Sequence, residues 1–238
     1  MAFVHGRNTE IWLGGFDLSV YCNDLAFSAD VDTAETSTFG SSWKTHLPGM
    51  AGAKVDVKGY FDPAGVPLLT DVIQAEAILT AGPAGMAAIG DLARLINVDE
   101  AAYAESSPVG GVVAFSTSFL ADGEVGFGKV AHELKEEAID GSSAYIDLGT
   151  AADGAVAHLH VTAVSAGESI VVSLSDATTS GGAYTTVTGG TFASKAAAGS
   201  ERLAIPGTLR RYVKANWDIT DNGGTVAITF AVAVARLP

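Results

Sequence analysis

The sequence is poor in cysteine and in positive charge, and each shortage argues against a class of protein. Its 238 residues include one cysteine, Cys22, so neither a disulfide nor a metal site of several thiolates can form within one chain. We expect Cys22 to be a buried structural thiol. The chain has 13 basic against 27 acidic residues, for a formal net charge of -14. Because phosphate contacts come from Lys and Arg, this balance argues against nucleic-acid binding.

A long hydrophobic run and an export signal are also missing. The longest apolar stretch, residues 226–235, is interrupted by Thr229 and has about half the length that a membrane-spanning helix needs. Residues 1–15 have neither the basic flank nor the apolar stretch of a signal peptide. We therefore expect no membrane partner and no export.

Motifs for catalysis or cofactor binding are absent as well. Residues 123–130 have the wrong glycine spacing for a phosphate-binding loop, and His132 lacks the second histidine of a zinc-protease helix. His158 and His160 lie two apart on an expected strand and so leave the same face, but no third metal ligand is evident. We expect these two histidines to face solvent or a neighbouring subunit. The sequence thus predicts a protein that is not an enzyme and has no cofactor and no metal.

What the sequence does contain is alternation of period two along most of its length, which favours sheets. In the first part, strands are expected at residues 16–27, 55–60, 112–120 and 125–134. The last two are expected to form a hairpin through residues 121–124. The exception is residues 62–75, where Asp62 can cap a helix and Pro63 suits its first position, which predicts a helix of two to four turns.

Charge divides the chain near residue 140. Residues 1–140 contain 20 acidic and 7 basic residues, whereas residues 141–238 contain 7 and 6. We expect two domains with these bounds. Short strands separated by Gly, Ser and Asp turns predict that the second is a β-sandwich, immunoglobulin-like or jelly-roll-like. Its seven strands are expected at residues 145–149, 156–164, 169–175, 183–188, 202–205, 210–219 and 225–235. Residues 221–224 suit a hairpin between the last two.

Several segments of the first part follow one another in an order that resembles a known family. They are the loop 39–49 with its aromatics Phe39 and Trp43, the strand 53–62, the segment 108–115, and the segments 119–123 and 126–129. Over about residues 8–135 this order resembles the major tail proteins, or tail tube proteins, of long-tailed, siphovirus-like bacteriophages. The resemblance implies a mainly β fold, a tail-tube β-barrel or sandwich with one flanking α-helix.

The same resemblance implies a structural virion protein that assembles into stacked rings, typically hexameric, around a conduit for genome ejection. The implied partners are further copies of the chain, tape measure and tail terminator proteins, and DNA in transit without specific binding. The protein would be made in the cytoplasm of a host bacterium and end in the virion tail, with its second domain decorating the outside of the tube. An inner tube of a contractile tail stays open. A capsid decoration or carbohydrate-binding surface module is the alternative, because the second domain alone would suit it.

Two sets of residues are candidates for assembly. Candidate contacts between rings or subunits are Phe39, Trp43, Leu47 and Pro48, with Met1 and Phe3 from the N-terminal segment. Candidate acidic residues facing the lumen are Asp30, Asp32, Glu35, Asp56, Asp122 and Glu124. A lumen rich in carboxylates repels phosphates, which would let DNA pass without binding.

Overall fold

The fold is that of a computed structural model, which describes residues 6–38, 42–62 and 76–237. It confirms a mainly β protein. Within these ranges the only helical element is the 3-10 turn η1 (Gly6–Asn8), so no described helix is long and apolar enough to cross a membrane. The helix predicted for residues 62–75 falls on residues 63–75, which lie outside the described part of the chain.

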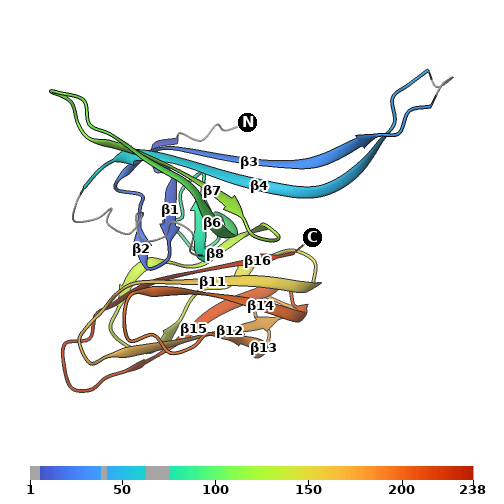
Figure 1. Ribbon diagram of the computed structural model, residues 1–238. Helices are drawn as coiled ribbons and strands as arrows, with labels where there is room; N and C mark the ends of the chain where they lie inside the picture. Colours follow the sequence, from blue (N-terminus) through green and yellow to red (C-terminus); the bar gives the residue numbers. More distant parts are fainter. Residues whose placement is uncertain (1–5, 39–41, 63–75, 238) are drawn as a thin grey trace.

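The described strands belong to two antiparallel sheets, a large one and a small one (Figure 1). They are β1 (Glu10–Leu13), β2 (Phe16–Asp17), β3 (Cys22–Glu35), β4 (His46–Tyr60), β5 (Glu76–Gly82), β6 (Leu92–Ser106), β7 (Ala114–Ala121), β8 (Gly126–Glu137), β9 (Gly141–Ser142), β10 (Ile146–Asp147), β11 (Ala152–Val164), β12 (Ser169–Ala177), β13 (Thr185–Thr191), β14 (Gly199–Leu209), β15 (Tyr212–Thr220) and β16 (Ile228–Arg236).

In the first part of the chain, the large sheet curls around a core of its own. Strand β3 pairs with β4, β4 with β7, β7 with β6, and β6 also with β5, which pairs with β1. Alternate side chains of β4 and β7, such as Val57 and Phe119, are buried against Leu13 and Leu79 from the opposite strands. Cys22, expected to be buried, is half-buried beside this core, and desolvation raises the pKa of its thiol to about 12.

The hairpin predicted between residues 112–120 and 125–134 is wrong. Strand β7 forms a hairpin with β6 instead, through residues 107–113, and Ser106 pairs with Ala114 at its end. Strands β7 and β8 follow one another along the same edge of β6, because Ala121 pairs with Val98 and Gly126 with Leu95. Residues 122–125 therefore interrupt a continuing edge and do not reverse the chain.

The second part forms the predicted β-sandwich, and all seven of its predicted strands are confirmed, as β10 to β16. One layer consists of β14, β11, β16 and β8 of the large sheet, and the other of β10, β15, β12 and β13 of the small sheet (Figure 1). Large apolar side chains from both layers, among them Leu159, Leu174 and Phe230, form the core between them. Residues 221–224 do not make the expected hairpin, because β15 and β16 belong to different sheets.

Strand β16 connects the two parts of the chain. It pairs with β11 on one edge and with β8 on the other, so the large sheet runs across residue 140. The division into domains 1–140 and 141–238 stays a prediction. Side chains of β16 are buried on both faces: Phe230 and Val232 point into the sandwich core, while Ala231 and Ala233 pack in a separate cluster that includes Trp12.

The expectation that His158 and His160 face solvent or a neighbour is wrong. Both are fully buried on β11, where the Oγ1 of Thr80 lies 3.0 Å from Nδ1 of His158 and 2.8 Å from Nε2 of His160. The other ring nitrogen of His160, Nδ1, lies 2.8 Å from the carbonyl oxygen of Gly14. These contacts join β11 to β5 and to the turn after β1, so the histidines serve packing between the two parts of the chain. Among the described residues, no group of three or more His, Cys, Asp or Glu side chains is placed to hold a metal ion.

Candidate assembly interface

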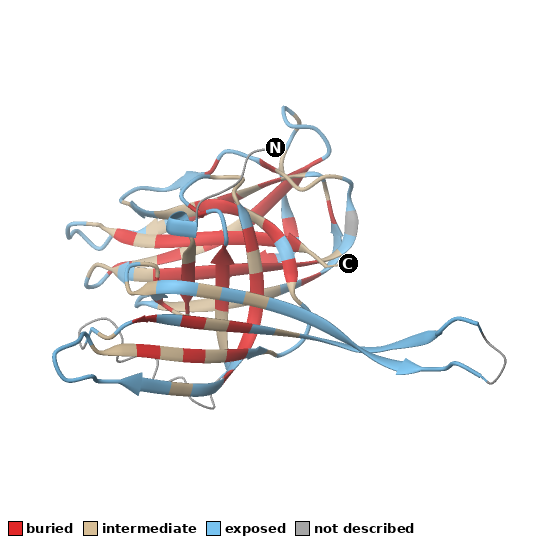
Figure 2. Ribbon diagram, turned by 90° about the horizontal axis from the view of Figure 1, so that it is seen from above, coloured by how far each residue is buried: buried red, intermediate tan, exposed pale blue. Residues whose placement is uncertain are grey.

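Among the described residues, a two-stranded ribbon leaves the body of the protein. Strands β3 and β4 pair along their whole length, but β4 pairs with β7 only from Lys54 to Tyr60. Residues 29–38 and 42–53 thus extend beyond the sheet, and we call them the arm (Figures 1 and 2). Every described side chain of the arm from Ala29 to Gly52 is exposed. An isolated two-stranded ribbon is only marginally stable in water.

Pairing between the two strands extends further along the arm than the sequence predicts. The stretch 39–49 was expected to be a loop, but residues from His46 onward belong to β4. Beyond the last strand pair, the backbone N–H of Thr36 donates to the carbonyl oxygen of Thr45 at 2.8 Å. The Nζ of Lys44 lies 2.9 Å from Oε2 of Glu35 on the facing strand. Hydrogen bonding across the ribbon thus replaces most of the expected loop.

Large apolar side chains on the arm are open to solvent. Trp43 is 85% exposed, Leu47 62% and Met50 81%. Among the predicted contact residues, Trp43 and Leu47 therefore lie on the arm, as does Pro48, which pairs with Thr33. Phe39, Met1 and Phe3 lie outside the described residues. Exposed apolar side chains gathered on one projection are typical of an interaction surface.

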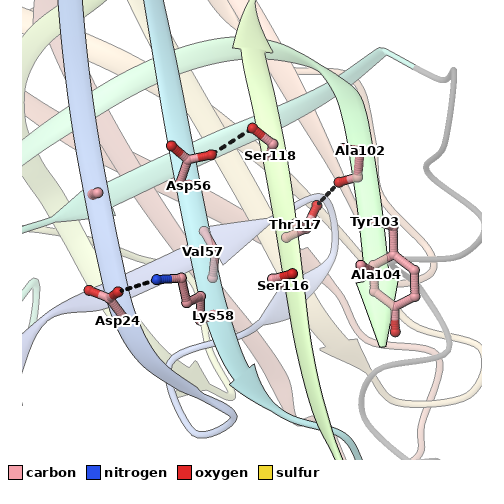
Figure 3. Close-up of a pocket in the computed structure, with 11 residues that line it drawn as sticks. Asp24, Asp56, Val57, Lys58, Ala102, Tyr103, Ala104, Ser116, Thr117 and Ser118 are labelled. Atoms are coloured by element: carbon pink, nitrogen blue, oxygen red, sulfur yellow. Dashed lines mark hydrogen bonds and ion pairs between the residues drawn. The ribbon is translucent and has the colours of Figure 1, made fainter. Parts of the chain in front are cut away.

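A second surface covers the outer side of the sheet from β3 to β6, and we call it the polar face (Figure 3). Most of its side chains are small or charged. They form a shallow hollow lined by Asp24, Ala26, Asp56, Val57, Lys58, Ala102, Tyr103, Ala104, Ser116, Thr117 and Ser118. No described group in this hollow combines a nucleophile, a base and a stabiliser in the manner of an active site.

Both lysines of the polar face are engaged by carboxylates. The Nζ of Lys58 lies 3.2 Å from Oδ2 of Asp24, and that of Lys54 lies 2.8 Å from Oδ1 of Asp56. The hydroxyl of Ser118 also donates to Oδ1 of Asp56 at 2.6 Å. The hydrogen bonds from Lys54 and Ser118 lower the pKa of the Asp56 carboxyl group. This face is therefore charged but largely self-neutralised.

The six candidate acids do not converge at one place. Asp56 lies on the polar face, whereas Asp30, Asp32 and Glu35 lie along the arm. The other two, Asp122 and Glu124, lie in the segment between β7 and β8. Their orientation toward a lumen stays a prediction.

Several residues of these surfaces are not among the predicted ones. Met50 is missing because the strand that contains it is expected to begin later. Lys54 and Lys58 are missing too, although a period of two places both on the same face as Asp56. That spacing was the signal that would have shown paired charges instead of isolated acids.

Comparisons with known proteins give only distant similarity. Neither a protein-family model nor a curated protein sequence matches the chain. One similar solved structure is the tail of an empty gene transfer agent particle, at 13% identity and a TM-score of 0.41, covering 52% of this chain and 98% of that one. Another is the SPP1 tail tube, at 11% identity and a TM-score of 0.40, covering 51% and 77%.

A third similar structure is the SPP1 Dit protein of a phage adsorption apparatus, at 10% identity and a TM-score of 0.37, covering 95% of this chain and 98% of that one. A sheath–tube complex of an extracellular contractile injection system is also similar, so the matches do not separate contractile from non-contractile tails. At TM-scores below 0.5, none of these similarities establishes a shared fold.

Proposed function

We propose that this chain is a structural subunit that assembles with further copies of itself into the stacked rings of a phage-type tail tube. The observation that carries the proposal is the arm, which holds Trp43, Leu47 and Met50 in solvent at a distance from the body. Burying such side chains in another chain is favourable, and large aromatics contribute disproportionately to association. The order of segments that resembles tail tube proteins supports the type of assembly.

In this proposal the rings are hexameric and the polar face lines the lumen. Its small side chains leave room, and each of its lysines, Lys54 and Lys58, lies beside a carboxylate, so passing DNA phosphates meet little net positive charge there. Of the candidate acids, Asp56 lies on this face, and its carboxylate faces the same passage. The β-sandwich decorates the outside of the tube, and tape measure and tail terminator proteins are the further partners of a virion tail subunit made in the host cytoplasm.

The test is replacement of Trp43 by alanine. Because Trp43 is 85% exposed, Trp43→Ala should change the free energy of unfolding by no more than about 0.5 kcal/mol. Negative-stain electron micrographs should nevertheless show tubes that are shortened or lost. Ile139→Ala is the matched control, because Ile139 is 75% exposed but lies outside the arm. Tubes of normal length from Trp43→Ala, or a wild-type chain that forms neither rings nor tubes, would refute the proposal.

One observation favours the alternative, a surface-binding module, for the second part of the chain. On the outer side of the small sheet, the rings of Tyr145 and Tyr212 lie edge to face with centroids 5.3 Å apart. The ammonium of Lys214 lies 4.6 Å from the ring centroid of Tyr184 nearby. Aromatic rings beside a cation offer a surface for sugars or other ligands. The same micrographs separate the two functions, since a surface-binding module would appear as discrete particles.

A further inference from the structure

A groove lies at the base of the arm, on the side of the sheet opposite the polar face. The groove is lined by Ala29, Asp30, Val31, Ala51, Gly52, Ala53, Ala121, Gly123, Glu124, Val125 and Phe127. Most of these side chains are small, and two larger apolar ones are open to solvent: Val31 is 49% exposed and Phe127 53%. Such a surface leaves room for one bulky apolar group.

Glu124 supplies the exposed negative charge of the groove. Asp30 also lines it, but Asp30 is in register with Asp24 and Lys58 on the polar-face side of the ribbon. The floor is fixed by packing, because the ring of Phe127 meets that of Phe27 edge to face, with centroids 6.2 Å apart, and the guanidinium of Arg94 lies 4.7 Å from the centroid of the Phe127 ring. The groove is therefore preformed and largely apolar, with the carboxylate of Glu124 at its rim.

The tip of the arm has the complementary properties. Trp43 is the bulkiest exposed side chain of the described residues, and the neighbouring Lys44 side chain is 73% exposed. Lys44 pairs with Glu35, but an ion pair between exposed side chains contributes little and exchanges partners readily. A large apolar ring beside a positive charge thus faces solvent at one end of the arm. The apolar groove with Glu124 at its rim lies at the other end.

The tip cannot reach the groove of its own chain. The nine residues from His46 to Lys54 are an extended strand, which at about 3.3 Å per residue separates tip and base by roughly 30 Å. The ribbon is hydrogen-bonded along this length, so it does not fold back. The occupant must come from another molecule that carries the same tip.

We propose that Trp43 and Lys44 of one copy dock into the groove of a second copy, with Trp43 among its small apolar residues and Lys44 against Glu124. This inference rests on the proposed function and names the surface that receives the arm. Tip and groove are different patches of one chain, so the contact is heterologous and repeats from copy to copy. Such contacts close into rings or continue into filaments.

The experiment reverses the two charges separately and then mixes the variants. Lys44→Glu alone sets a negative tip against a negative groove, and Glu124→Lys alone sets a positive tip against a positive groove. In each case we expect at least a tenfold loss of polymer, measured by sedimentation and electron microscopy of the full chain, because like charges in a contact oppose association. In a 1:1 mixture, each tip meets a groove of opposite charge, and tubes should return.

The outcomes are separable. If either single variant polymerises like the wild type, or if the mixture of two folded variants stays monomeric, the docking inference is wrong while the tube proposal stands. If the wild type itself forms no rings or tubes, the proposed function fails. Circular dichroism and a thermal melt establish that both variants are folded.

Cross-linking gives an independent readout of the same contact. In a Cys22→Ser background, Ser42→Cys places a thiol beside Trp43, and Ala29→Cys places one in the groove. Oxidising a mixture of the two variants should yield a disulfide-linked dimer of one copy of each, recognisable by a size tag on one of them. A cross-link yield no higher than that of Ser42→Cys mixed with a Val112→Cys control, whose thiol lies in the β6–β7 loop, would overturn the inference.

Discussion

The arm and strand β16 are both β-structure, yet they use their side chains in opposite ways. Along the arm, every described residue from Ala29 to Gly52 is exposed. In β16, the six consecutive residues from Phe230 to Ala235 are all buried, and they alternate between the two faces of the strand. The burial that stabilises the fold is therefore concentrated in β16, whereas exposed apolar side chains are concentrated on the arm.

The alternation within β16 shows how one strand serves two cores. Phe230, Val232 and Val234 fill the sandwich, and the alanines between them allow close approach on the other face. A strand with neighbours on both edges and layers on both faces reads as a continuous apolar run. The arm has neighbours on neither face, so its order depends on hydrogen bonds within the ribbon and on whatever it binds.

Truncation of a large buried side chain of β16 should have the strongest effect on stability. Phe230 is fully buried, and its ring stacks on that of His132 with centroids 4.3 Å apart. Phe230→Ala should therefore lower the free energy of unfolding by about 3–5 kcal/mol, through lost burial and a cavity. Urea unfolding followed by circular dichroism measures the change.

The control for Phe230→Ala is Met50→Ala on the arm, where the side chain is 81% exposed. We expect Met50→Ala to change the free energy of unfolding of the monomer by no more than about 0.5 kcal/mol. Similar losses of unfolding free energy from the two substitutions would show that the arm belongs to the folded core as β16 does.

A smaller effect concerns the histidines between the two parts of the chain. Burial lowers the pKa of His160 to about 4, although its contact with the carbonyl of Gly14 opposes the shift. The unfolded chain binds a proton near pH 6.5, so the contribution of His160 to stability is complete above that pH and is lost as the pH falls toward 4. A difference of about 2.5 pH units corresponds to about 3 kcal/mol.

Substitution of His160 isolates this dependence. We expect His160→Gln to flatten the loss of unfolding free energy between pH 6.5 and 4, measured by urea unfolding at several pH values. His46→Gln is the matched control, since His46 lies on the exposed arm. Thr80 and Trp12 contact His160, and His158 lies beside it with Arg202 nearby. All four residues remain in both variants. If the pH profile of His160→Gln matches that of the wild type, His160 does not titrate as its burial predicts.

The sequence was sufficient for most strands but not for their partners. Alternation located all seven strands of the sandwich, since a half-buried strand repeats every two residues. It did not show that β7 continues into β8 along one edge of β6, because pairing depends on contacts between segments far apart in the chain. For the same reason, residues 221–224 looked like a hairpin turn while they connect two sheets.

The candidate site was predictable to a similar degree. Trp43 and Leu47 are predicted as apolar contacts because they lie in the loop 39–49, one of the segments that resemble tail tube proteins. The length of the ribbon was not, because its outer half has no buried face, and so its alternation gives no hydrophobic signal. The burial of His158 and His160 also escaped prediction, since their partner Thr80 lies about 80 residues away in the sequence.

Removal of an exposed ion pair on the arm should change stability least. Glu35→Gln removes the ion pair with Lys44 near the arm tip, where the two side chains are 45% and 73% exposed. Solvent and salt screen such a pair, so the free energy of unfolding should change by less than about 0.5 kcal/mol. Lys44 is then released for contact with a second copy, and polymerisation should be unchanged or stronger, as measured by sedimentation. A loss of polymer from Glu35→Gln would mean that Lys44 acts through its own chain, by holding the tip in shape, and that the arm is ordered before it meets a partner.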